Sequence, residues 1–125
     1  MRTWLKEIRE GKGLRASAVA HMAGMDVGYY SRIENGKIKQ LTFKVAERIA
    51  KALEFSVYEF FKDDKFGALK VRIGQFGFSY ESLAEELDIA VTCLIDKVNG
   101  KRKFKWEEIK KLCTLLYIEN PLDWF

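Results

Sequence analysis

The sequence predicts an all-α protein made of two tandem units of five short helices each, at residues 1–64 and 68–125. Three observations support this fold class. Apolar residues recur at helical spacing, polar residues or glycines separate the helical stretches, and the pattern repeats after about 64 residues. An alternating strand pattern occurs only at 70–73, within a stretch that we assign to a helix.

The first unit begins with a helix whose apolar residues Trp4, Leu5 and Ile8 share one face. A second helix is predicted at 16–23, and Gly24 breaks it. A glycine at this point suits a turn that needs a positive φ, which other residues rarely adopt.

The remaining helices of the first unit follow from their caps. Asp26 is the expected N-cap of a third helix at 27–34, which Asn35-Gly36 closes. Thr42 is the expected N-cap of the fourth helix, and Ser56 of a last turn. Short polar side chains fit these positions because they accept hydrogen bonds from the unpaired amides of a first helical turn.

The second unit repeats this order. Its helices are predicted at 67–76, 80–87, 91–98, 105–117 and 121–125. Gly13-Leu14 is matched by Gly77-Phe78, and Asn35-Gly36-Lys37 by Asn99-Gly100-Lys101. The sequence distance between matched residues of the two units falls from about 64 to about 63 after Asn-Gly, because the loop there is one residue shorter in the second unit. A shift confined to loops is expected of two related folds.

Charge and hydropathy narrow the function classes. The net charge of +4 lies entirely within residues 1–66, while residues 67–125 are neutral. Such a mild basic excess is compatible with nucleic-acid binding. No apolar run approaches a membrane span, and the charged first residues lack the apolar segment of a secretory signal. We therefore expect a cytoplasmic protein with no membrane partner.

Few residues offer metal or catalytic chemistry. His21 is the one histidine, and Cys93 and Cys113 are too far apart in sequence to suggest a zinc site. Neither of the two glycine-rich nucleotide-binding motifs, G-x-x-x-x-G-K-S/T and G-x-G-x-x-G, occurs between strand and helix signals. We predict that the protein is not an enzyme, that it holds no metal or cofactor, and that both thiols are reduced.

The most specific pattern lies between Ala20 and Lys37. Two short helices with small inward residues, a glycine between them and a polar cap on the second make a helix-turn-helix. Ala20 lies where the two helices cross, so a larger side chain would push them apart.

Here the sequence resembles the phage-repressor helix-turn-helix family of the Cro/cI or XRE type. The residues that carry the resemblance are Gly13-Leu14, Ala20, Gly24 and the run from Ser31 to Lys37, within about 4–61. The second unit resembles a more divergent copy through Leu83-Ala84, Leu87, Ile89 and the run from Val98 to Lys101. The resemblance implies two lambda-repressor-like domains and double-stranded DNA as partner.

The resemblance also implies residue roles, because the family's third helix lies in the major groove. Val27, Gly28 and Arg32 then face the DNA. An arginine can bridge guanine O6 and N7, and a valine can touch a thymine methyl. Lys37 and Lys39 follow this helix and are expected to contact phosphates.

Further positions are assigned by the same resemblance. Ala16 stands where the family has a phosphate-binding glutamine, and Arg15 beside it can take over that contact. Independently of the resemblance, the helical spacing puts Tyr30 on the inward face and leaves Tyr29 able to reach the phosphate backbone. Arg9 and Glu34 match a buried ion pair of the family; the alternative is that both are solvated.

The second unit replaces that ion pair by Ile73 and Val98. An ion pair exchanged as a unit for apolar groups is often neutral or stabilising. This exchange supports the alignment of the two units.

The third helix of the second unit is a weaker DNA reader. Its groove-facing positions are Val91, Thr92 and Asp96, and Asp96 replaces an arginine. A basic run follows this helix; its members are Lys101, Arg102, Lys103 and Lys105. The run either contacts phosphates or is a solvated loop that offsets nearby acidic residues.

Two functions remain open. The first is a sequence-specific DNA-binding transcriptional regulator, a repressor of phage or mobile-element type. We expect it to act as a homodimer with no small-molecule ligand. The second is a protein-binding module on the same scaffold, such as an antirepressor, an antitoxin or an inhibitor of a host nucleic-acid enzyme. The weak readers Val27, Gly28 and Asp96 motivate the second function.

Overall fold

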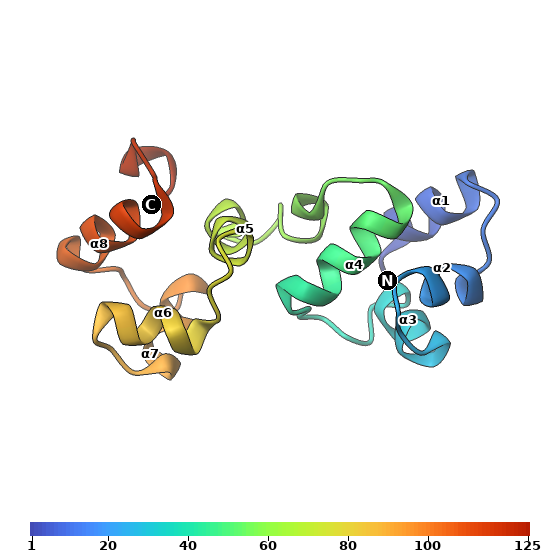
Figure 1. Ribbon diagram of the computed structural model, residues 1–125, viewed down its shortest axis with the longest axis horizontal. Coiled ribbons are helices and arrows are strands. Elements are labelled where there is room, and N and C mark those ends of the chain that lie inside the picture. The colour runs from blue at the N-terminus through green and yellow to red at the C-terminus, as the bar shows by residue number, and fades with distance from the viewer. The chain divides into compact units, whose positions relative to one another are not determined.

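The computed structural model describes residues 1–125 and contains only helices, which confirms the all-α prediction (Figure 1). The chain divides into two compact units, Met1–Glu59 (unit 1) and Phe60–Phe125 (unit 2). Unit 1 holds α1 (Thr3–Gly11), α2 (Ala16–Met22), α3 (Val27–Glu34), α4 (Phe43–Leu53) and all but the last residue of the 3-10 helix η1 (Val57–Phe60). Unit 2 holds α5 (Gly67–Gln75), α6 (Tyr80–Leu87), α7 (Val91–Val98), α8 (Trp106–Leu116) and the 3-10 helix η2 (Pro121–Asp123).

Side-chain caps start two helices of unit 1, as the sequence indicates. The Asp26 carboxylate accepts hydrogen bonds from the amides of Gly28 and Tyr29, at 2.9 and 3.2 Å. The Thr42 hydroxyl accepts from the amide of Val45 at 3.4 Å. Each cap satisfies amides that the first turn of a helix leaves unpaired, and so fixes where α3 and α4 begin.

The core of unit 1 joins its four α-helices. Ala20 is 1% exposed on α2, which packs against α3 and α4. This burial agrees with the requirement for a small residue at the crossing of α2 and α3. The side chains that fill the core with no exposed surface are Leu5, Val19, Tyr30, Ile33, Ala46, Ile49 and Leu53. They come from all four helices, so the position of α3 is fixed by the whole unit.

Unit 2 has a separate core. Ile73 and Val98 lie in it, 2% and 0% exposed. Their neighbours are Leu69, Leu83, Ala84, Leu87, Leu94, Leu112, Leu116 and Ile118. α6 begins with a capping box in which Ser79 and Ser82 satisfy each other's amides. Apolar packing therefore occupies the place where the sequence alignment puts the ion pair of unit 1.

Backbone conformation matches between the units. The eight residues with positive φ form four pairs, each about 64 residues apart. The pairs are Gly13 with Gly77, Gly24 with Asp88, Gly36 with Gly100, and Glu54 with Tyr117. Positive φ is uncommon outside glycine. The two pairs that include other residues, Gly24 with Asp88 and Glu54 with Tyr117, therefore add to the glycine matches of the sequence a sign that the two units turn the chain alike.

The structure departs from the predicted helix limits at the ends of both units. The last helical segment of each unit is a 3-10 turn rather than an α-helix. The predicted 105–117 helix is shorter at both ends, because Lys105 is its extended N-cap and Tyr117 has a left-handed φ of 54°. None of the helices combines the length and the apolarity needed to cross a membrane.

Candidate nucleic-acid interface

The first candidate element is the exposed face of α3. Val27 opens the helix with 45% of its side chain exposed, and Arg32 is exposed one turn later. The guanidinium of Arg32 lies 5.9 Å from the centre of the Tyr29 ring. Such a cation–π contact holds an extended arginine side chain near one orientation. Arg32 and the half-buried Tyr29 thus lie together on α3, and Val27 is exposed at its first residue.

The N-terminal end of α3 presents side chains rather than free amides. The Asp26 carboxylate already binds the amides of Gly28 and Tyr29. A Cβ atom on Gly28 would lie 2.9 Å from that carboxylate oxygen, so the glycine leaves room for the cap. An anion at this helix end would therefore have to displace Asp26, and recognition falls to Val27 and Arg32.

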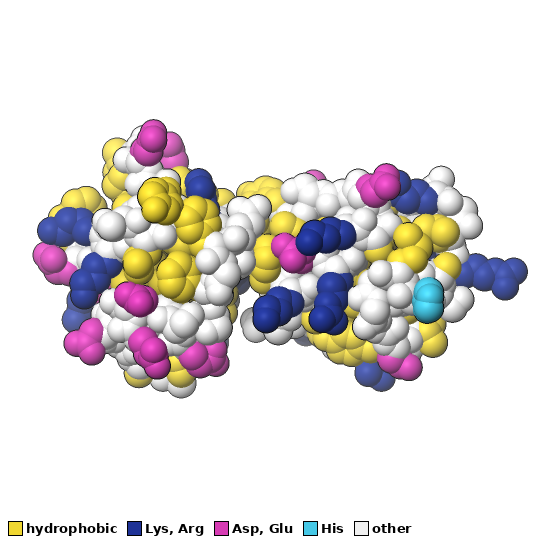
Figure 2. Space-filling model, viewed as in Figure 1, with side chains coloured by type: hydrophobic (Ala, Val, Ile, Leu, Met, Phe, Trp, Pro, Cys, Tyr) yellow, Lys and Arg dark blue, Asp and Glu magenta, His cyan; other side chains and the backbone are white.

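Three further basic side chains of unit 1 are exposed. Arg15 is the N-cap of α2, and Lys37 and Lys39 lie in the loop between α3 and α4. None of these three side chains, nor Arg32, forms an ion pair. On the face drawn in Figure 2, basic side chains predominate over unit 1 and acidic ones gather over the lower part of unit 2. Unpaired cations beside an exposed helix attract polyanions.

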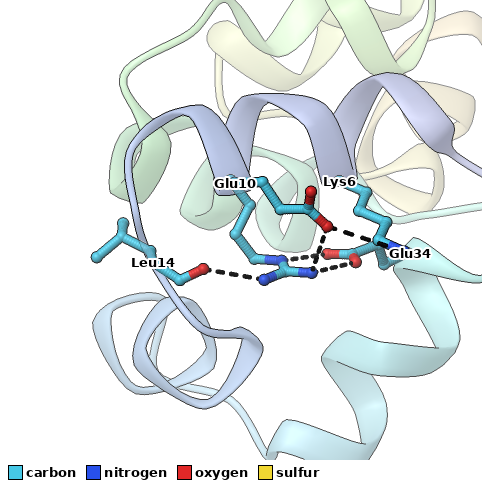
Figure 3. Close-up of polar contacts among 5 residues, drawn as sticks. Lys6, Glu10, Leu14 and Glu34 are labelled. Carbon is cyan, nitrogen blue, oxygen red and sulfur yellow. Dashed lines mark hydrogen bonds and ion pairs between the residues drawn. The ribbon is translucent and has the colours of Figure 1, made fainter.

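A buried ion pair ties α3 to α1. Nε and one terminal nitrogen of Arg9 donate to the two Glu34 carboxylate oxygens at 2.9 and 2.8 Å. Arg9 also donates to the Leu14 carbonyl at 2.9 Å and approaches Glu10 at 4.0 Å, as Figure 3 shows. Glu34 is 6% exposed. The bidentate geometry fixes the C-terminal end of α3 relative to α1.

Electrostatics keep the Glu34 carboxylate charged. Burial raises the pKa of Glu34, but the hydrogen bonds and the positive charge of Arg9 lower it by a larger amount, so the pKa lies below its ordinary value. Burial, followed by the neighbouring Glu34 carboxylate, raises the pKa of the Tyr30 phenol. Arg9 and Glu34 are therefore a permanent ion pair at neutral pH.

The corresponding surface of unit 2 differs. Val91 packs partly against the core, which leaves Thr92 as the exposed residue at the start of α7. The Asp96 carboxylate forms an ion pair with Nε of Arg102 at 3.4 Å, and a terminal nitrogen of Arg102 lies 3.9 Å from the Cys93 sulfur. Part of the basic run thus folds back onto α7, while Lys101 and Lys103 stay exposed.

Sequence reasoning missed a second buried ion pair. Lys97 on α7 and Glu108 on α8 are 4% and 6% exposed, and the lysine ammonium donates to both carboxylate oxygens. The amide of Lys105 donates to the same carboxylate at 2.8 Å. Burial raises the pKa of Glu108, but the hydrogen bonds from Lys97 and from the Lys105 amide lower it by a larger amount, so the net shift of this pKa is downward. No local pattern distinguishes these two residues from a solvated pair.

The structure contains no metal-binding cluster. No group of three or more His, Cys, Asp or Glu side chains is arranged to hold an ion, and both Cys93 and Cys113 are free thiols. What the candidate surface offers is shape, positive charge and hydrogen-bond donors.

Comparison with known proteins finds a family match over most of the first unit. Residues 5–60 match a family model described as Helix-turn-helix, of the XRE type. This family consists of DNA-binding regulators. No curated protein and no solved structure matches the chain significantly. The matched range runs from within α1 to the end of η1, and so contains Val27, Arg32, Lys37 and Lys39.

Proposed function

We propose that the chain is a sequence-specific, double-stranded-DNA-binding transcriptional regulator, a repressor of phage or mobile-element type. The observation that carries the proposal is the surface of unit 1. Arg15, Arg32, Lys37 and Lys39 are exposed and unpaired beside the helix that the family uses to read DNA. Helix-turn-helix proteins insert this helix into the major groove.

Each side chain of this surface has a separate role in the proposal. Arg32 donates to O6 and N7 of a guanine, and Val27 contacts a thymine methyl group. Gly28 carries no side chain to read a base. Arg15, Tyr29, Lys37 and Lys39 contact phosphates, which adds affinity without sequence information.

Unit 2 is, in the proposal, a divergent copy that does not read bases. The four matched positive-φ positions support a common backbone path. The repeat aligns Asp96 with Arg32 of unit 1, so an acidic side chain, paired with Arg102, stands where unit 1 has an exposed arginine. Lys101 and Lys103, with Arg102 where it is released from Asp96, and the exposed Thr92 add backbone contacts. A homodimer on a two-fold operator is the expected binding form, because such regulators pair their symmetry with that of the site.

Selection of duplexes from a random pool by the full chain, at two salt concentrations, tests this function. A two-fold motif that contains a guanine contacted through Arg32 is expected, with weaker binding at higher salt. Lys51→Ala serves as the control: Lys51 pairs with Glu47 on the outer face of α4, so this variant is expected to select the same motif as the wild type. Enrichment without any sequence preference, or no enrichment at all, contradicts the proposal.

A protein-binding module is the second candidate. It is favoured by the surface of unit 2, where Val91 packs against the core and Asp96 holds Arg102. Capture of one stoichiometric protein partner, together with no binding to any duplex at low salt, would replace the first candidate with this one.

A further inference from the structure

Arg2 lies just before α1 and contacts the far end of α3. Its amide donates to the Glu34 carbonyl at 2.8 Å. One terminal nitrogen of its guanidinium donates to the Ile33 carbonyl, and to the Ile38 carbonyl at 2.8 Å. The other terminal nitrogen donates to the Lys39 carbonyl at 3.0 Å. One side chain therefore joins the last turn of α3 to the loop that follows it.

This contact suits the chemistry of both partners. The last carbonyls of a helix lack partners within the helix, and cations near a helix C-terminus are stabilising. A planar guanidinium can donate to several acceptors in fixed directions, which an ammonium cannot. The contacts of Arg2 therefore hold Ile38 and Lys39 at a set distance from the end of α3.

The corresponding loop of unit 2 is held differently. Phe66 is the residue that the repeat aligns with Arg2, and its ring lies 5.5 Å from that of Phe104 in an edge-on contact. Phe104 lies in the loop after α7. Both units thus hold this loop from the segment before their first helix. Only unit 1 does so through the backbone of the segment that carries the exposed Lys37 and Lys39.

We propose that Arg2 is a positioning residue for the phosphate contacts of Lys37 and Lys39. The inference rests on the proposed DNA-binding function. The guanidinium faces carbonyl oxygens of its own chain, so its effect on DNA passes through the loop. Without Arg2 the amides of Lys37 and Ile38 keep only their hydrogen bonds to the Arg32 carbonyl, at 2.9 and 3.3 Å. The loop then samples more conformations, and DNA binding must order it at an entropic cost.

The test measures duplex affinity of the full chain against salt concentration. Each phosphate contact contributes about 0.9 to the slope of log affinity against log salt. Loss of both lysine contacts lowers the slope by about 1.8, so the affinity loss between 50 and 200 mM salt becomes about 12-fold smaller. Arg2→Met is expected to approach this value, and Arg2→Lys to resemble Arg2→Met although it keeps the charge. Lys51→Met, which removes a charge from the outer face of α4, is expected to leave the slope unchanged.

A second set of variants separates positioning from direct contact. In a Lys37→Ala, Lys39→Ala background, Arg2→Met is expected to lower the slope no further. A further decrease of about 0.9 would mean that Arg2 itself touches a phosphate, and would overturn the inference. A wild-type slope in Arg2→Lys would also overturn it, because charge alone would then suffice.

Hydrogen exchange makes the outcome independent of DNA. Arg2→Met is expected to speed amide exchange at Lys37 and Ile38 by at least about tenfold while the buried amides of α4 keep their protection. Unchanged exchange in that loop overturns the positioning role. If the wild-type chain binds no duplex, the proposed function fails together with this role, even where exchange shows that Arg2 holds the loop.

Discussion

Exchanging the Arg9–Glu34 pair for the apolar pair of unit 2 should change stability in a way that the single substitutions do not. The substitutions are Arg9→Ile and Glu34→Val, which copy Ile73 and Val98. The Arg9 and Glu34 side chains are 13% and 8% exposed, so neither remaining partner can be solvated without rearrangement. Removing one partner of a buried ion pair strongly lowers the free energy of unfolding, whereas replacing both partners by apolar residues often leaves it unchanged.

The structure indicates which single substitution costs more. Arg9→Ile leaves a buried carboxylate without its arginine, and we expect a loss of about 4 kcal/mol in the free energy of unfolding. Glu34→Val leaves an arginine that still donates to the Leu14 carbonyl, so about 3 kcal/mol is expected. The double variant should lie within about 1 kcal/mol of the wild type, which gives a coupling energy of several kcal/mol.

Urea unfolding followed through Trp4 measures these differences. The chain has three tryptophans, so Trp106→Phe and Trp124→Phe leave Trp4 as the only one, in unit 1. The Glu47–Lys51 pair, with side chains 39% and 78% exposed, is the matched control, and its removal should cost under about 0.5 kcal/mol. Additive losses in the Arg9 and Glu34 double variant would refute the reasoning.

The dependence of this pair on pH has a definite sign. The pKa of Glu34 is below its ordinary value in the folded chain, so the unfolded chain takes up its proton first as the pH falls. The contribution of the pair is complete above the unfolded-state pKa of about 4.3, and is lost as the pH falls through the lower folded pKa. The free energy of unfolding of the wild type should therefore fall relative to that of the double variant only below about pH 4.3, when both are measured by urea unfolding.

Three further predictions concern other parts of the chain. Lys97→Met leaves the buried Glu108 carboxylate without its partner and should lower the free energy of unfolding of unit 2 by about 3–5 kcal/mol. Urea unfolding followed by tryptophan fluorescence measures this loss. A loss below about 1 kcal/mol, which is typical of an exposed ion pair, would contradict the prediction. In Gly24→Ala the new Cβ meets no atom within 4 Å, so only the positive φ is strained and the loss in the free energy of unfolding should be about 1–2 kcal/mol. In Gly36→Ala the new Cβ also lies 2.6 Å from the backbone nitrogen of Met1, so the melting temperature should fall more than in Gly24→Ala. Equal costs would contradict the close approach. Lys37→Ala should lower the salt slope of duplex binding by about 0.9, and an unchanged slope would remove this lysine from the interface.

Much of the fold could be predicted because helix boundaries are encoded locally. Asp26, Thr42 and Ser79 accept hydrogen bonds from amides two or three residues away, so sequence spacing alone reveals them. The residues that end α4 and α8 are harder to predict. Glu54 and Tyr117 adopt left-handed conformations that glycine usually takes, and no sequence rule points to them.

The candidate site divides in the same way. The exposed side chains of α3 follow from the helix-turn-helix pattern, because their positions depend on one short helix. The contacts of Arg2 are to backbone carbonyls, which carry no sequence signal. The Lys97–Glu108 pair depends on how α7 and α8 pack, and that packing comes from a core shared by all of unit 2. Tertiary contacts of these kinds need the structure.

The most direct test of the account is a double-mutant cycle between Arg32 and the guanine of its selected duplex. The affinities of the wild type and Arg32→Ala are measured for that duplex and for one in which this base pair is replaced, at one salt concentration. A bidentate arginine–guanine contact predicts a coupling of about 1–3 kcal/mol, so that Arg32→Ala no longer distinguishes the two duplexes. Equal discrimination by both proteins would show that α3 does not read this base through Arg32, and would contradict the proposed mode of recognition.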